Sequence, residues 1–204
     1  MIKNILFDFG GVIVDIDRDA AVRQFKLAGF ENIEEYLDPY RQKGFFHKFE
    51  DGTVSREEFY AEISKTAGKS IDSKSIDKGW LDFILPVEQK RLDLIAQLKT
   101  RYRMLLLSNT NPIVMEWANS EAFSLAGKPL SHYFDSMFMS YKMHCMKPDP
   151  EIFRQTIEQS GIVPEETLFI DDSKANIDAG AAFGLKIFHF TRNSSFDDIK
   201  NKLQ

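Results

Sequence analysis

The chain has 204 residues, of which 43% are hydrophobic and 28% charged, with a net charge of −5 and a pI near 5.4. This length suffices for one complete hydrophobic core and a modest second module, and the composition excludes fibrous and disordered chains. An acidic surface repels phosphate backbones, so we expect no binding to nucleic acid through a broad basic face.

The cysteine content and the hydropathy pattern indicate where the protein works. Cys145 is the single cysteine, which precludes a disulfide within the chain and fits a reducing compartment. The N-terminus has no export signal, and no apolar stretch approaches the roughly 20 residues that span a bilayer. We therefore expect a cytoplasmic protein without membrane association, and the sequence leaves the oligomeric state unknown.

The first predicted element is the apolar run Ile2–Phe7, which is typical of a strand buried on both faces of a parallel sheet. Residues 17–86 follow, and they contain several helical stretches but no convincing buried strand. Within them, Ser55 and Glu58 form a capping box that starts one helix, after a turn at Asp51-Gly52. We expect residues 17–86 to form a helical module inserted between the first two strands of the core.

After residue 86 the pattern alternates between strands and helices. The predicted strands are Met104–Leu107, Asp135–Met139, Leu168–Ile170 and Lys186–Phe190, and the predicted helices are 92–98, Pro150–Ser160 and Ala175–Phe183. Asp149 is a suitable N-cap for the helix at 150–160, and Gly161 a suitable stop. The alternation predicts an α/β fold with a Rossmann-like parallel sheet core, formed by residues 1–16 and 87–204, and an inserted helical cap at 17–86.

Polar side chains follow three of the predicted strands. They are Asp8, the run Ser108-Asn109-Thr110 and the pair Asp171-Asp172, and Lys147 precedes a helix between the second and third of these groups. Ligands of parallel sheets bind outside the carboxyl ends of the strands, so we expect these side chains to meet at one rim. Converging carboxylates repel one another unless a cation joins them, and Mg²⁺ prefers oxygen ligands. The sequence therefore predicts a Mg²⁺ site beside a lysine.

Four segments resemble, in order, the four motifs of the haloacid dehalogenase superfamily. They are Phe7–Ile13 (FDFGGVI), Leu107–Thr110 (LSNT), Lys147–Pro150 (KPDP) and Phe169–Ser173 (FIDDS). Each motif alone is weak, but all four in order are specific, and they span essentially the whole chain. The insertion after the first motif is similar to the mobile cap of the cap-bearing subgroup. The first motif also resembles that of an α-glucose 1-phosphate phosphatase-like subgroup.

The resemblance implies a Mg²⁺-dependent phosphatase of small phosphorylated metabolites. Asp8 would be the nucleophile and would form an aspartyl-phosphate intermediate. Ser108 and the backbone amide of Asn109 would bind the phosphoryl group, and Lys147 would neutralise its charge. The implied catalytic residues are thus Asp8, Ser108 and Lys147. The implied metal ligands are Asp8, the Gly10 carbonyl and Asp172, with Asp171 bound directly or through water.

One position departs from the family pattern. Most phosphatases of the superfamily carry a second aspartate two residues after the nucleophile, as general acid and base, and here that residue is Gly10. Such help is worth about 10²–10⁴-fold in rate. Because anomeric hydroxyls leave more easily than ordinary alcohols, a sugar 1-phosphate is the favoured substrate. His47, Glu50, Asp51 and Trp80 lie in the cap, where a role in specificity is as plausible as ordinary packing.

Two alternatives remain open at this point. A metal-independent haloacid dehalogenase uses the same aspartate nucleophile on carbon and would tolerate Gly10, but dehalogenating relatives carry serine and asparagine where this chain has Asp171 and Asp172. A catalytically impaired binding protein on the same scaffold would explain Gly10 as a lesion. Against that loss of chemistry, the chain has all four of the implied active-site residues Asp8, Ser108, Lys147 and Asp172.

Overall fold

The core of the computed structural model, which describes residues 1–38 and 41–203, is a parallel sheet in the order β3-β2-β1-β4-β5. The strands are β1 (Asn4–Phe7), β2 (Arg103–Ser108), β3 (Ser136–Met139), β4 (Thr167–Asp171) and β5 (Lys186–His189). All five coincide with predicted strands to within a few residues. The predicted α/β fold class is confirmed.

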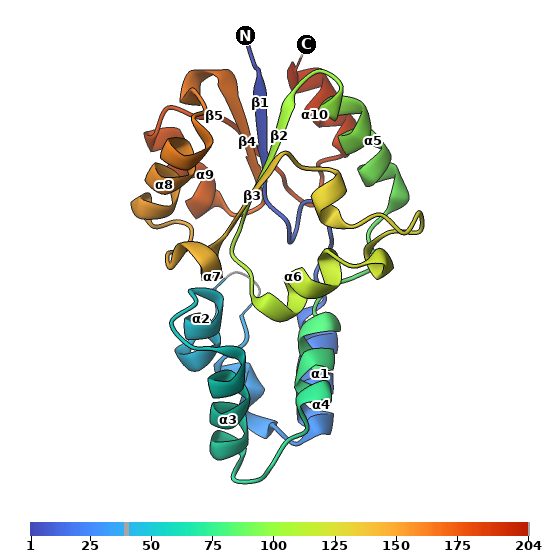
Figure 1. Cartoon of the computed structure of the whole chain (residues 1–204), viewed down its shortest axis with the longest axis vertical. Coiled ribbons are helices and arrows are strands. Elements are labelled where there is room, and N and C mark those ends of the chain that lie inside the picture. Colours follow the sequence, from blue (N-terminus) through green and yellow to red (C-terminus); the bar gives the residue numbers. More distant parts are fainter. Residues whose placement is uncertain (39–40, 204) are drawn as a thin grey trace.

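Helices cover both faces of this sheet (Figure 1). They are α5 (Gln89–Lys99) and α10 (Phe196–Leu203) on one face, and α8 (Pro150–Ser160) and α9 (Lys174–Ala182) on the other. Side chains alternate along a strand, so Ile5 and Phe7 join the apolar cluster of the first pair while Leu6 joins that of the second. This burial of both faces explains why the strands are continuous apolar runs.

The helix α8 illustrates how local signals set an element's bounds. The Asp149 side chain accepts a hydrogen bond from the Glu151 amide at 2.8 Å, and Gly161 ends the helix with a left-handed φ of 67°. Both features were predicted. The remaining elements of this half are α6 (Pro112–Ala118), α7 (Ser140–Met143) and the short 3₁₀ turns η2 (Glu121–Phe123), η3 (Leu130–His132) and η4 (Pro164–Glu166).

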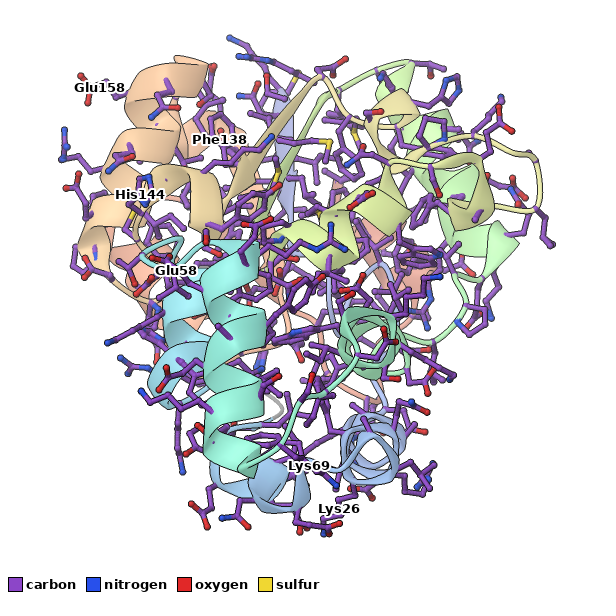
Figure 2. All side chains as sticks on the ribbon, turned by 60° about the horizontal axis from the view of Figure 1, so that its bottom comes forward. Lys26, Glu58, Lys69, Phe138, His144 and Glu158 are labelled. Carbon is purple, nitrogen blue, oxygen red and sulfur yellow. The ribbon has the colours of Figure 1, made fainter. Side chains whose placement is uncertain are left out.

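The segment between β1 and α5 forms helices that lie beyond the carboxyl ends of the strands (Figure 1). They are α1 (Arg18–Ala28), the 3₁₀ turn η1 (Glu31–Glu35), α2 (Gly44–Glu50), α3 (Arg56–Ala67) and α4 (Ser73–Leu81). We keep the name cap for residues 17–86. The capping box at Ser55 and Glu58 is present, and Figure 2 shows Glu58 at the end of α3 nearer the core, with Lys69 at the far end.

The cap has an aromatic interior of its own. Phe25, Phe46, Phe59 and Trp80 are almost fully buried, and each such side chain contributes about 1.5–3 kcal/mol. The rings of Phe46 and Phe59 meet edge to face with centroids 4.9 Å apart. Gly79 allows α4 to pack closely against α1, because a Cβ atom there would lie 2.6 Å from the Phe25 ring. Contacts within the cap therefore stabilise it.

Two chain segments connect the cap to the core, and they run side by side. The amide of Asp17 donates to the carbonyl of Phe83, and the amide of Leu85 donates to the carbonyl of Asp15, both at 2.9 Å. The guanidinium of Arg91 binds both carboxylate oxygens of Asp15, at 3.0 and 2.8 Å. Across the described residues, no helix has both the length and the apolar character needed to cross a membrane.

Candidate active site

The carboxyl ends of the strands bring the predicted residues to one rim. Asp8 directly follows β1, Ser108 ends β2, and Asp171 ends β4 with Asp172 after it. Asp8, Asp171 and Asp172 each present a carboxylate oxygen, and these three oxygens lie within 4.8 Å of one another. Lys147 lies on the loop between α7 and α8. Side chains separated by up to 164 positions in the chain therefore form one cluster.

Lys147 is the buried cation of this cluster. Its Nζ atom lies 2.8 Å from Asp8 Oδ1 and 2.7 Å from Asp171 Oδ2, and it donates a further hydrogen bond to the Leu107 carbonyl at 2.8 Å. Burial lowers the pKa of Lys147, but the two carboxylates outweigh this effect and raise it above its ordinary value. Lys147 is therefore a fixed positive charge next to Asp8.

The side chain of Asn109 holds Lys147 in place. Its Nδ2 donates to the Lys147 carbonyl, and its Oδ1 accepts from the Lys147 amide, both at 2.8 Å. Asn109 also lines the pocket beside Asp8. The Ser108 hydroxyl instead donates to the Asn109 carbonyl at 3.3 Å, and Ser108 is absent from the described lining of that pocket. Contact of Ser108 with a phosphoryl group stays a prediction.

The two adjacent aspartates have different surroundings. Asp171 is fully buried and accepts hydrogen bonds from Lys147, from the Ser173 amide at 2.8 Å and from Asn176 Nδ2 at 3.0 and 3.2 Å. Asp172 lines the pocket with Asp8. Sequence reasoning missed Asn176, although its place in the first turn of the helix after β4 is a signal that it could face the end of that strand.

The acidic cluster carries more negative charge than Lys147 alone offsets. Burial is the largest cause of the raised pKa of Asp8, with Asp171 and Asp172 adding to it against Lys147. Burial and then Asp171 raise the pKa of Asp172 to about 6. A second cation would allow all three groups to ionise, and a donor set made only of oxygens suits Mg²⁺. The residues therefore fit the predicted metal.

Two glycines lie at this rim. Gly11 has a φ of 74°, and a Cβ atom there would lie 2.3 Å from Asp172 Oδ2, so a side chain would push that carboxylate away. Gly10 lines the pocket beside Asp8 and brings no carboxylate to it. Gly11 thus allows the close approach of Asp172, whereas a Cβ atom at Gly10 would meet only Ile16 Cγ2, at 3.5 Å.

The cap forms the other wall of the pocket. Glu50, the last residue of α2, and Trp80 on α4 both line it. His47 and Asp51 form a pair at 3.6 Å and lie outside the described lining of this pocket. Of the four cap residues weighed from the sequence, the structure therefore places Glu50 and Trp80 beside Asp8.

Comparison with known proteins identifies the class. A family model described as haloacid dehalogenase-like hydrolase matches residues 2–184, and the chain belongs to this family. The chain is 45% identical over 188 residues to the D-ribitol-5-phosphate phosphatase of Bacteroides thetaiotaomicron, a match that covers 92% of this chain and 91% of the relative. The predicted enzyme class, a phosphatase within this hydrolase family, is confirmed.

Two solved structures are similar over nearly the whole chain. A HAD-like family hydrolase from Porphyromonas gingivalis has a TM-score of 0.95 and 38% identity, covering 100% of this chain and 98% of that one. A HAD family enzyme from Bacteroides thetaiotaomicron, in complex with magnesium and inorganic phosphate, has a TM-score of 0.90 and 36% identity, covering 98% and 99%.

Proposed function

We propose that this enzyme is a magnesium-dependent phosphatase of small phosphorylated sugars or polyols, with Asp8 as the nucleophile. The observation that carries the proposal is the contact of Asp8 with the buried cation Lys147, 2.8 Å away, within the acidic cluster that Asp8 forms with Asp171 and Asp172. The 45% identical relative named for D-ribitol 5-phosphate supports the substrate class.

The chemistry assigned to the core residues follows from their contacts. A carboxylate oxygen of Asp8 attacks phosphorus and gives an aspartyl-phosphate, which water then hydrolyses. Lys147 favours the ionised form of Asp8 and offsets the negative charge of the phosphoryl oxygens. Asp171 and Asn109 act by holding Lys147 in position. Ser108 and the Asn109 amide are assigned to the phosphoryl oxygens on the family pattern.

Asp8, Asp172 and the Gly10 carbonyl would hold Mg²⁺, with Asp171 bound directly or through water. Both oxygens of Asp171 already accept hydrogen bonds from protein groups, which supports Asp172 as the direct ligand. When bound, Mg²⁺ would neutralise the phosphoryl oxygens and make phosphorus more electrophilic.

The leaving group is the finer part of the proposal. Gly10 favours a sugar 1-phosphate, because its anomeric oxygen needs little protonation. D-ribitol 5-phosphate, after which the relative is named, is instead the ester of a primary alcohol, a poorer leaving group. We include both ester types in the proposed range, and the preference for the 1-phosphate stays a prediction.

A panel of sugar 1-phosphates, sugar 6-phosphates and polyol 5-phosphates tests the proposal, assayed for phosphate release with Mg²⁺ and with excess chelator. We expect release only with Mg²⁺. Asp8→Asn should reduce it at least about 10³-fold while changing the free energy of unfolding by no more than about 1 kcal/mol. Chloride release from 2-chloropropionate without metal would favour the dehalogenase instead, and binding of phosphate esters without turnover would favour the binding protein.

A further inference from the structure

We propose that Glu50, which the cap contributes, is the general acid and base that position 10 does not provide. The proposal rests on the proposed phosphatase function and adds one catalytic residue to it. Three observations support it: the position of Glu50 relative to the core, the surroundings of its carboxyl group, and the polar groups next to it in the pocket.

The backbone of Glu50 is tied to the rim of the core. Its carbonyl accepts a hydrogen bond from the Ser140 hydroxyl at 2.6 Å, and the same hydroxyl oxygen accepts from the Thr110 amide at 2.9 Å. Thr110 belongs to the loop after β2 that also carries Asn109. The next turn of the cap is equally close, since a Cβ atom on Gly52 would lie 2.1 Å from the Tyr141 carbonyl oxygen. Glu50 is therefore held at the active-site rim.

The carboxyl group of Glu50 is buried in the pocket without a partner. The residue is only 7% exposed, and the side chain has no hydrogen bond or ion pair with any described residue. Buried polar groups normally have a partner in the protein, so an unpartnered one in a pocket points to a ligand. Burial, with a smaller contribution from Asp51, raises the pKa of Glu50 to about 8, which keeps a proton available near neutral pH.

The charged groups around this pocket are compatible with that role. Asp8, Asp172 and Lys147 line it from the core, and Lys147 is already shared between Asp8 and Asp171. From the cap, Asp51 adds to the raised pKa of Glu50 and itself pairs with His47 at 3.6 Å. A bound phosphate would add negative charge to the pocket, which further favours a protonated carboxyl group beside it.

Two further buried donors lack a partner among the described residues, and both line the same pocket. They are Trp80 Nε1, on α4, and Asn111 Nδ2, at the start of α6. Each can donate to a hydroxyl oxygen of a sugar or polyol. Their presence in the same pocket as Glu50 supports binding of the leaving group there, next to the phosphoryl group assigned to Lys147.

The assigned steps balance in atoms and charge. In the first step, an Asp8 oxygen bonds to phosphorus, the bond from phosphorus to the ester oxygen breaks, and that oxygen takes the proton of the Glu50 carboxyl group. In the second, water attacks the aspartyl-phosphate and gives its proton to the Glu50 carboxylate, while the electron pair of the broken bond returns to Asp8. The products are alcohol and phosphate, and Glu50 is protonated again.

Substituted phenyl phosphates and 2-phenylethyl phosphate, which carry no hydroxyl groups, separate acid catalysis from substrate recognition. For Glu50→Gln we expect kcat/KM on 2-phenylethyl phosphate to fall about 10²–10³-fold, and kcat/KM on 4-nitrophenyl phosphate to change less than about threefold, because nitrophenolate leaves without a proton. The matched control is Glu57→Gln, an exposed glutamate on α3, which should leave both values unchanged.

A rapid-mixing experiment tests the second step. With 4-nitrophenyl phosphate, Glu50→Gln should release one equivalent of nitrophenol in a burst and then turn over slowly, because the aspartyl-phosphate lacks its base. Equal losses on all esters without a burst, or a loss confined to the KM of polyol phosphates, would overturn the proposal. A wild-type enzyme that releases no phosphate from any ester would refute the proposed function, and the role of Glu50 with it.

Discussion

The two walls of the active-site pocket differ in how their buried polar groups are satisfied. On the core wall, Lys147 has three acceptors within 2.8 Å, and Asp171 receives hydrogen bonds from three residues. On the cap wall, the buried Trp80 Nε1 has no partner among the described residues, and the Glu50 side chain, 7% exposed in the pocket, makes no hydrogen bond or ion pair with them. Lys147 and Asp171 of the core wall are satisfied within the protein, whereas Asn111 Nδ2 at the start of α6 and the polar groups of the cap wall are open to a ligand.

This difference has an energetic meaning. An unpaired buried polar group costs about 1–3 kcal/mol, so the cap wall is destabilising until a ligand occupies it. Lys147 and Asp171 have already met that cost through their own hydrogen bonds, so this part of the core wall is preorganised for a group of constant shape, such as phosphate. The arrangement therefore combines fixed phosphoryl chemistry with a leaving-group site that depends on the cap.

The largest expected effect follows from removal of the buried cation of the core wall. Lys147→Met leaves the fully buried Asp171 without its cation, and we expect the free energy of unfolding to fall by about 3–5 kcal/mol, with loss of turnover. Denaturant titration of the purified variant measures the first effect. The same substitution at Lys174, which pairs with Asp178 on the surface of α9, should change stability by less than about 0.5 kcal/mol. Equal losses of unfolding free energy at both positions would contradict the claim that buried Lys147 stabilises the core wall.

The second-largest expected effect is the pH dependence of the unfolding free energy that Glu50 contributes to the cap wall. The pKa of Glu50 is about 8 in the folded protein and near 4.3 in an unfolded chain, so the folded state binds the extra proton between these values. The contribution of Glu50 to the free energy of unfolding should therefore be fully present below about pH 4 and be lost as the pH rises towards 8.

Glu50→Gln removes this dependence. Relative to that variant, the wild type should lose up to about 4 kcal/mol of unfolding free energy between pH 5 and pH 8, at about 1.36 kcal/mol for each pH unit. Denaturant titrations of both proteins at several pH values measure the difference, with Glu57→Gln as the control that should run parallel to the wild type. Parallel curves for Glu50→Gln would mean that this carboxyl group is ionised in the folded protein.

The smallest expected effect concerns the contact between the two walls. Gly52 and Gly68 both have positive φ, 75° and 67°, but only at Gly52 would a Cβ atom meet the core, 2.1 Å from the Tyr141 carbonyl oxygen. Gly68→Ala should cost about 1 kcal/mol from backbone strain alone. Gly52→Ala should cost about 1–2 kcal/mol more in thermal or denaturant unfolding, and should lower turnover of primary-alcohol phosphates. Equal costs would show that the cap does not depend on this contact.

The sequence by itself determined most of the core. Its strands are buried on both faces, and such strands must be continuous apolar runs, which makes them visible without a structure. Parallel strands end at one edge, so the polar residues that follow them were expected to meet, and Asp8, Lys147 and Asp171 do meet there. The order of four short motifs added the family, which the comparisons confirm.

Only the tertiary structure shows which residues form the cap wall and which residues hold Lys147 in place. In the sequence, Glu50 is one polar residue near the end of a short helix, and nothing in the spacing of that helix reveals that it packs at α7 and places Glu50 in the pocket. The sequence likewise gives no sign that the Asn109 side chain hydrogen-bonds the Lys147 backbone. Helical periodicity reports which face of a helix is apolar, whereas the burial and pKa of a polar side chain depend on the distant segment that packs against it.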